Sequence, residues 1–195
     1  MLWSKKEDVG VDEKEKVVVL FSGGSDSTLL IELAHKMEKE VFAVLVDYGQ
    51  VIKEELEYAK KYLEKNDIEY KEVIISGYDV SSGLTTGEKG MYTGVHEMNV
   101  PARNTIFLSI AAGIAESNRI REVWIGCDMD DFYGKFADCF QSYIAELNNT
   151  FKIAFSYPIT VEAPLLGFRK KMVLKLLKDF GIEEKDLYSG YREFV

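Results

Sequence analysis

The stretch "VVVLFSGGSDSTLL", residues 17–30, decides the fold class. It runs from a short β-branched apolar segment into two glycines and a cluster of hydroxyl side chains, and then returns to leucines at helical spacing. This order predicts a buried strand, a tight turn and the start of a helix. Because the first N–H groups of a helix lack intrahelical partners and the helix dipole is positive there, such a turn is a binding site for an anion, most often phosphate.

The residue types in the loop fit a phosphate group. Gly23 and Gly24 allow backbone angles closed to other residues and let a ligand approach the main chain. The loop also offers short hydroxyl donors, from Ser22, Ser25, Ser27 and Thr28. Asp26 leaves two interpretations open: a carboxylate beside a phosphate needs a cation between them, or the side chain caps the helix. The loop has neither the Gly-Lys-Ser/Thr ending of a Walker A motif nor a GxGxxG pattern.

Apolar segments and amphipathic patterns alternate along the rest of the chain. The predicted strands are residues 17–21, 41–47, 70–76 and 122–126, with a short one within 159–166. The predicted helices are residues 26–39, 52–65, a segment around 106–114, 137–155, and 172–180 followed by Gly181. This alternation predicts an α/β fold, a doubly wound and mostly parallel sheet flanked by helices. We expect residues 1–13 to form a flexible arm, residues 14–195 to form a single domain, and the glycine-rich stretch 77–101 to be a functional loop.

Composition narrows the classes of partner. The 195 residues carry 33 acidic and 24 basic side chains, a net charge of −9, which disfavours binding to a nucleic-acid backbone and favours a small-molecule ligand. No apolar signal core or membrane-length segment occurs, so we expect a cytoplasmic protein without a membrane partner. Cys127 and Cys139 are too few and too separated in sequence for a four-cysteine zinc site, and we expect none.

Five segments carry a resemblance to a known family. "SGGSDS" at 22–27 resembles the SGGxDS loop of the PP-loop ATP pyrophosphatases, which have a HUP-like fold. The other segments are similar, in the right order, to motifs of the 7-cyano-7-deazaguanine synthase family: "VDYGQVIKEELEYAKKY" at 46–62, "NVPARNTIFLSIAAGIAE" at 99–116, "IGCDMDDFYGKFADC" at 125–139 and "APLLGFRK" at 163–170. One such motif is weak evidence, whereas five in order over residues 17–190 identify the chain as a member of this family.

The resemblance implies a chemistry and a set of site residues. It implies that ATP with Mg²⁺ activates the carboxylate of 7-carboxy-7-deazaguanine as an acyl-adenylate, that ammonia then gives the amide, and that a second activation gives the nitrile. It also implies a homodimer. The expected catalytic residues are Asp26, Arg103, Asp131 and Lys170, with Asp26 and Asp131 as Mg²⁺ ligands. The expected nucleotide-binding residues are Phe21, Ser22, Gly23, Gly24, Ser25, Asp26, Ser27, Thr28, Asp47, Tyr48, Gln50, Arg103 and Asn104.

Several of these residues have a structural alternative. Asp47 either approaches the ribose or adenine from a strand end or forms a turn. Tyr48 and Gln50 either shape the pocket or lie exposed in that turn. Asn104 either caps a helix or contacts substrate. Lys170 either binds phosphate or belongs to a solvated basic face.

The acidic loop after the fourth main strand also has two interpretations. Acidic clusters such as Asp128, Asp130 and Asp131 usually face solvent, but at a strand end one of them can bind Mg²⁺ or a guanine-like edge.

The sequence departs from the family pattern on the side expected to hold the base-like substrate. Gly190 stands where the first cysteine of a zinc cluster would fall, Ala102 replaces a glycine, Ala137 replaces a proline and Phe140 replaces an arginine. These departures leave alternatives open: a related ligase with a changed substrate or amine acceptor, as in phage DNA modification or antiviral systems, or a non-catalytic nucleotide-binding partner protein.

Overall fold

The structure is a computed structural model that describes residues 15–78, 100–134, 136–183 and 187. Its sheet has five strands in the order β3-β2-β1-β4-β5, and every pairing among them is parallel. The strands are β1 (Lys16–Leu20), β2 (Glu40–Asp47), β3 (Glu69–Ile74), β4 (Glu122–Trp124) and β5 (Thr160–Glu162). The helices are α1 (Ser25–Lys36), α2 (Glu54–Lys65), α4 (Arg103–Ser117), α5 (Met129–Tyr133), the 3₁₀ turn η2 (Ala137–Cys139), α6 (Gln141–Ala154) and α7 (Lys170–Asp179). The predicted α/β class and parallel sheet are confirmed.

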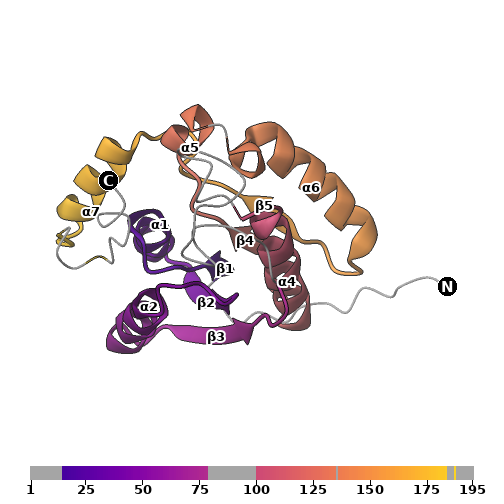
Figure 1. Ribbon diagram of the computed structural model, residues 1–195, viewed down its shortest axis with the longest axis horizontal. Coiled ribbons are helices and arrows are strands. Elements are labelled where there is room, and N and C mark those ends of the chain that lie inside the picture. Colours follow the sequence, from indigo (N-terminus) through magenta and orange to yellow (C-terminus); the bar gives the residue numbers. More distant parts are fainter. Residues whose placement is uncertain (1–14, 79–99, 135, 184–186, 188–195) are drawn as a thin grey trace.

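Helices cover both faces of the sheet, as Figure 1 shows. Successive residues of a strand point to opposite faces, so Val18 and Val44 pack on one side while Val19 and Leu45 pack on the other. The first face is covered by α4 and α6, and the second by α1, α2 and α7. Two apolar cores therefore bury the central residues of β1, β2 and β4, while the ends of these strands reach the surface.

The strand order determines where a ligand can bind. β1 pairs with β2 on one side and with β4 on the other, and the chain leaves β1 and β4 toward opposite faces of the sheet. The two connections diverge above the carboxyl ends of β1 and β4, which is where open α/β sheets bind ligands.

Some element boundaries differ from the predictions. The first helix ends at Lys36, not at residue 39, because Glu38 adopts a left-handed φ of 59° that stops the helix. The helix predicted from residue 137 begins at Gln141, because Phe140 is extended and separates it from η2. α5 lies in a stretch predicted to be a loop. Gly181, at φ 83°, follows α7 as predicted.

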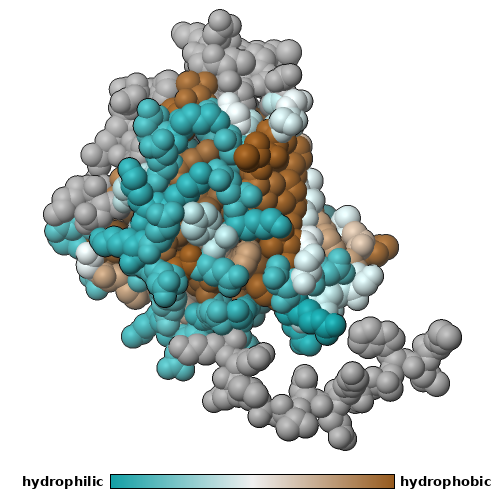
Figure 2. Space-filling model, turned by 90° about the horizontal axis from the view of Figure 1, so that it is seen from below, coloured by the Kyte–Doolittle hydropathy of each residue, from teal (hydrophilic) through white to brown (hydrophobic). Residues whose placement is uncertain are grey.

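Helix α4 is apolar on more than its buried side. Ile106, Ile110 and Ile114 are half-buried, and Figure 2 shows apolar residues gathered on the side of the molecule where α4 lies. The homodimer stays a prediction. None of the helices in the described residues combines the length and the apolar character needed to cross a bilayer. The arm predicted at residues 1–13, Gly190 and most of the loop predicted at 77–101 lie outside the described residues.

The residue before α4 has an unusual backbone. Ala102 is the N-cap of α4 and has φ 57° and ψ 15°, in the left-handed region where a Cβ is disfavoured. The resembled motif has glycine at this position. The structure thus gives a physical reason for that glycine, and this chain keeps the conformation at an energetic cost.

We expect Ala102→Gly to raise the free energy of unfolding by about 0.5–1 kcal/mol, since the relieved backbone strain exceeds the added entropy of the unfolded glycine. Chemical denaturation measures the difference. Ala111→Gly, at a buried position inside the same helix, is the matched control and should lower stability by about 1 kcal/mol or more. A variant Ala102→Gly no more stable than the parent would show that the left-handed backbone is not strained.

Candidate active site

The loop between β1 and α1 is built as an anion-binding turn. Gly23 has φ 82°, and a Cβ there would lie 3.2 Å from the Cβ of Ala59 in α2, so only glycine fits. α1 begins at Ser25 with Gly24 as its N-cap, and within the described residues no side chain caps it. The N-terminal N–H groups of α1 are therefore left for an external acceptor.

The hydroxyl groups of the loop divide into two kinds. Ser27 is buried; its Oγ accepts from the Ser22 N–H at 3.2 Å and donates to the Gly24 carbonyl at 3.2 Å. Thr28 is completely buried as well. Ser22 is exposed and Ser25 half-buried, so these two hydroxyls are the ones placed to meet a ligand. Nucleotide contacts by Ser27 and Thr28 stay predictions. The Ser27 hydroxyl shapes the loop, whereas Thr28 Oγ1 is buried without a hydrogen-bond partner among the described residues.

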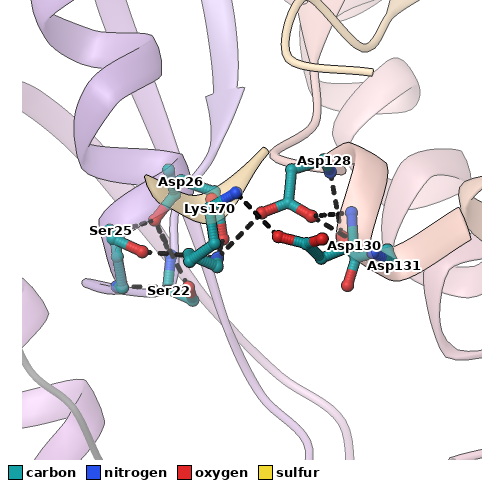
Figure 3. Close-up of polar contacts among 9 residues, drawn as sticks. Ser22, Ser25, Asp26, Asp128, Asp130, Asp131 and Lys170 are labelled. Carbon is teal, nitrogen blue, oxygen red and sulfur yellow. Dashed lines mark hydrogen bonds and ion pairs between the residues drawn. The ribbon is translucent and has the colours of Figure 1, made fainter. Parts of the chain in front are cut away.

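Lys170 joins the loop to the acidic segment after β4 (Figure 3). Its Nζ forms an ion pair with Asp26 Oδ2, lies 3.1 Å from Asp128 Oδ2 and donates to Ser25 Oγ at 3.5 Å. Burial alone would lower the pKa of Lys170, but the two carboxylates raise it above its usual value, so the ammonium group stays charged. The alternative of a purely solvated basic face is wrong for this lysine.

Asp26 lies on α1 with its carboxyl group in the crevice. It does not cap α1, because Gly24 occupies the N-cap position. Burial raises the pKa of Asp26 to about 6, Lys170 opposes the rise, and the neighbouring Asp128 and Asp131 add to it. Asp26 Oδ1 is buried without a hydrogen-bond partner among the described residues. Of the two interpretations of Asp26, capping of α1 is therefore wrong, and a role beside a cation and a phosphate stays a prediction; in the structure Asp26 is paired with Lys170.

Asp128 is the residue that the sequence analysis did not select. Its side chain is fully buried, and Oδ1 accepts from the backbone N–H groups of Asp130 at 2.8 Å and Asp131 at 3.1 Å. Asp131 Oδ2 accepts from the Asp128 N–H at 2.9 Å, which completes a capping box at the start of α5. Asp128 is fully buried and Asp131 is half-buried, so the solvent-facing alternative is wrong for both, and burial raises the pKa of Asp131. The spacing of Asp128 and Asp131, two acids three residues apart, was the sequence signal that could have indicated a capped helix.

Asp130 connects the same short helix to α7. Its Oδ2 accepts from the Lys170 backbone N–H at 2.8 Å, and its Oδ1 lies 3.5 Å from Arg169 Nη1. This carboxylate caps the N-terminus of α7 and so helps to hold Lys170 over the loop.

The segment after β2 forms the second part of the site. Asp47 Oδ1 accepts from the Gly49 N–H at 3.0 Å and from Lys53 Nζ at 2.7 Å. Partial burial favours the neutral form, yet these two donors hold the pKa of Asp47 below its usual value. Asp47 is therefore a turn former, as the structural alternative had it, and its contact with ribose or adenine stays a prediction.

Tyr48 and Gln50 point inward. Gln50 is buried, and its Oε1 accepts from the Tyr48 N–H at 3.1 Å. Arg103 Nη1 donates to Tyr48 Oη at 3.3 Å, with the guanidinium 5.8 Å from the ring centroid. The alternative of exposed turn residues is wrong for Tyr48 and Gln50. Arg103 opens α4 as predicted and, in this structure, contacts Tyr48.

Phe21 and Gly126 also contact the segments that form the loop between β1 and α1. The Phe21 side chain is buried with its ring 5.5 Å from that of Tyr62, and its N–H donates to the Val44 carbonyl, so only its backbone faces the loop. Gly126, which the sequence analysis did not single out, lies against α1: a Cβ there would be 2.9 Å from the Asp26 Cβ and 3.0 Å from the Ser27 nitrogen. The segment after β4 and the first turn of α1 approach this closely only because residue 126 has no side chain.

The third part of the site lies beside the acidic segment 128–131 and contains Asn104 and the two cysteines. Asn104 is the second residue of α4, not its cap, and its Nδ2 lies 3.6 Å from Cys139 Sγ. Cys127, Asp131 and Cys139 each offer a ligand atom, and these atoms lie within 4.8 Å of one another. The two cysteines, although separated in sequence, lie close together because η2 brings Cys139 back to the end of β4; the expectation that they form no four-cysteine zinc site stays a prediction.

Comparisons with known proteins identify the family and support the fold. The family model for queuosine biosynthesis protein QueC matches residues 16–194. A 7-cyano-7-deazaguanine synthase from Clostridium botulinum (strain 657 / Type Ba4) is 35% identical over 176 residues, covering 87% of this chain and 80% of that protein. The solved U34-tRNA thiolase NcsA from Methanococcus maripaludis has a TM-score of 0.60 at 21% identity over 91% of this chain, which spans 61% of the thiolase. The NH₃-dependent NAD synthetase from Campylobacter jejuni has a TM-score of 0.56 at 21% identity, covering 90% and 68% of the two chains. These two structures support the PP-loop fold.

Replacing Gly126 tests the close approach of the segment after β4 to the start of α1. We expect Gly126→Ala to lower the free energy of unfolding by about 1–3 kcal/mol, because the added Cβ must push α1 away from β4. Gly113→Ala is the control, since a Cβ at that helical position meets nothing within 4 Å and should be neutral or stabilising. Equal stability of the two variants would contradict the close approach.

Asp26 should give the stability a pH dependence. A pKa of about 6 against 3.8 in the unfolded chain means that the native state holds more protons between pH 4 and 6, so stability from this group falls as pH rises through that window. We expect Asp26→Asn to remove this loss and to be more stable than the parent at pH 8 by on the order of 1 kcal/mol. Denaturant unfolding at pH 4, 5, 6 and 8 measures it, with the exposed Glu57→Gln as control. Parallel profiles of the parent and Asp26→Asn would contradict the raised pKa.

Proposed function

Because the chain belongs to the QueC family of 7-cyano-7-deazaguanine synthases, enzymes that form C–N bonds, we propose that it uses ATP to convert 7-carboxy-7-deazaguanine into 7-cyano-7-deazaguanine. The carboxylate attacks the α-phosphorus of ATP, which forms an acyl-adenylate and releases pyrophosphate. Ammonia displaces AMP to give the amide. A second adenylation of the amide oxygen, followed by loss of AMP, gives the nitrile. The immediate substrates are thus a small carboxylate and ammonia.

The observation that carries this proposal is the position of Lys170. An ammonium group held between Asp26 and Asp128 lies directly beside the open N-terminus of α1, where a pyrophosphate group would bind. Transfer of an adenylyl group requires charge neutralisation and alignment more than covalent help. Lys170 and the α1 N–H groups supply positive charge at the leaving pyrophosphate, and the Ser22 and Ser25 hydroxyls add donors at the same edge.

The donor atoms near the loop fit Mg²⁺ at Asp26. Asp26 Oδ1 is a buried oxygen without a hydrogen-bond partner among the described residues, and Mg²⁺ takes one or two carboxylate oxygens together with phosphate oxygens. When bound, Mg²⁺ neutralises charge on the triphosphate. Asp131, the other predicted Mg²⁺ ligand, has two thiol groups within 4.8 Å, a donor set that suits this hard cation poorly.

The other predicted residues are proposed to bind the nucleotide or the acceptor. Arg103 presents a planar guanidinium half-buried next to Tyr48, a group that suits a phosphate or a carboxylate. Gln50 and Tyr48 would line the nucleotide-binding pocket. Asn104, next to Cys139 on the far side of α4's first turn, would face the base-like substrate.

A related ligase with a changed acceptor is the second candidate. The feature that favours it is the segment with the sequence departures: Ala137 opens η2, and Phe140 packs its ring 4.8 Å from that of Phe132. An aromatic contact therefore stands where the family places an arginine, and a different acid or amine would fit such a change.

The direct test is release of pyrophosphate from Mg²⁺-ATP with 7-carboxy-7-deazaguanine, with and without ammonium, followed by mass spectrometry of the product. Ammonium-dependent formation of the nitrile supports the proposal. A product that remains the amide or carries another amine favours the second candidate. ATP binding without release of pyrophosphate for this acid would refute the proposed substrate.

A substitution at Lys170 tests whether its positive charge is needed for the reaction. We expect Lys170→Met, which keeps the length and apolar stem but removes the charge, to lower kcat for pyrophosphate release by about 100-fold or more. Lys171→Met, the next residue along α7, is the matched control and should retain activity. Comparable losses in both variants would mean that the charge of Lys170 has no special role.

A further inference from the structure

Two thiols and a carboxyl group converge next to the phosphate loop. Cys127 follows β4, Asp131 lies on α5 and Cys139 ends η2, and one ligand atom from each lies within 4.8 Å of the other two. The thiol residues are almost fully buried, with 1% and 7% of their surfaces exposed. We propose that these three side chains bind one soft divalent metal ion, of which Zn²⁺ is the natural occupant.

The separations suit a metal ion without rearrangement of the fold. Zinc lies about 2.3 Å from a thiolate sulfur and about 2.0–2.2 Å from a carboxylate oxygen. In a tetrahedral arrangement, neighbouring ligand atoms are then roughly 3.5–4 Å apart. Three atoms already within 4.8 Å of one another reach those spacings by small rotations of their side chains.

Hydrogen bonds hold the backbone around the three ligands in place. The Cys139 N–H donates to the Phe136 carbonyl at 3.0 Å, and the Cys127 N–H donates to the Ile125 carbonyl at 3.1 Å. Asp131 Oδ2 accepts from the Asp128 N–H, which orients the carboxyl group, and no hydrogen bond occupies Oδ1 among the described residues. Outer hydrogen bonds of this kind are typical of carboxylates that bind metals. The Asn104 amide, 3.6 Å from Cys139 Sγ, adds a donor that stabilises a thiolate.

The donor set selects the class of metal and leaves a coordination position open. Mg²⁺ and Ca²⁺ take oxygen ligands, whereas two sulfurs favour Zn²⁺ or another thiophilic ion. Three protein ligands from the described residues are one short of a closed tetrahedral site, so water or a donor atom of a substrate would complete the shell. Asp131 is linked through Asp128 to Lys170, which puts the ion next to the phosphate loop.

This inference does not depend on the substrate proposed above. It concerns metal binding by the resting protein, and its measurements need neither ATP nor an acceptor acid.

The test is a cobalt titration of the full chain, purified under reducing conditions and freed of metal with a chelator. We expect thiolate-to-cobalt charge-transfer absorption that saturates at about one equivalent and disappears when Zn²⁺ is added. Cys139→Ser and Asp131→Asn should weaken binding by at least about 10–100-fold, since loss of even an outer partner of a ligand has an effect of that size. Asp138→Asn, which removes the same charge next to Cys139 without removing a ligand, is the matched control and should bind like the parent.

Protection of the thiols gives a second readout that needs no variant. Zinc should slow the chemical modification of both cysteines in the native parent protein. Absence of charge-transfer absorption, unchanged affinity in Cys139→Ser and Asp131→Asn, or modification rates that zinc does not alter would overturn the proposal. A Cys127–Cys139 disulfide in the reduced preparation would overturn it too.

Discussion

The contact between Lys170 and the carboxylates of Asp26 and Asp128 holds the candidate site together. It joins three segments distant in sequence: the loop after β1, the turn after β4 and the start of α7. Asp130 strengthens the same junction by capping α7 at the backbone of Lys170. Without this lysine, two carboxyl groups would face each other in a partly desolvated crevice, which is an unfavourable arrangement.

The junction is arranged for a ligand more than for stability. Asp26 keeps a buried oxygen without a partner and a pKa raised to about 6, and the N-terminus of α1 has no side-chain cap in the described part of the chain. Each feature has an energetic cost in the free protein that a bound cation or phosphate would offset. Ala102 adds a left-handed backbone at the other helix that opens toward the site. Concentration of such costs at one edge of an otherwise well-packed sheet is typical of a functional site.

The local pattern was a reliable guide wherever one property dominated a segment. The β-branched segments became β1 and β2 because burial on both faces of a parallel sheet demands continuous apolar runs. The glycine turn was predicted correctly because its backbone requires glycine: Gly23 fits the turn only without a Cβ. α5 was missed because a five-residue helix has too few turns for a detectable period, and its capping box involves only two acidic side chains. The break at Phe140 was missed because the apolar period continues across a backbone that is not helical.

By itself, the sequence determined the α/β class, the phosphate loop and the family, because these depend on local residue patterns and on the order of motifs. Only the tertiary structure decided which acid meets Lys170, why residue 126 must be glycine, and that Cys127 and Cys139 lie side by side. The physical reason is that these relations are contacts between different elements, separated by 12 residues for the two cysteines and by many more for the other pairs. Their partners are set by strand order and helix packing, which no local period records.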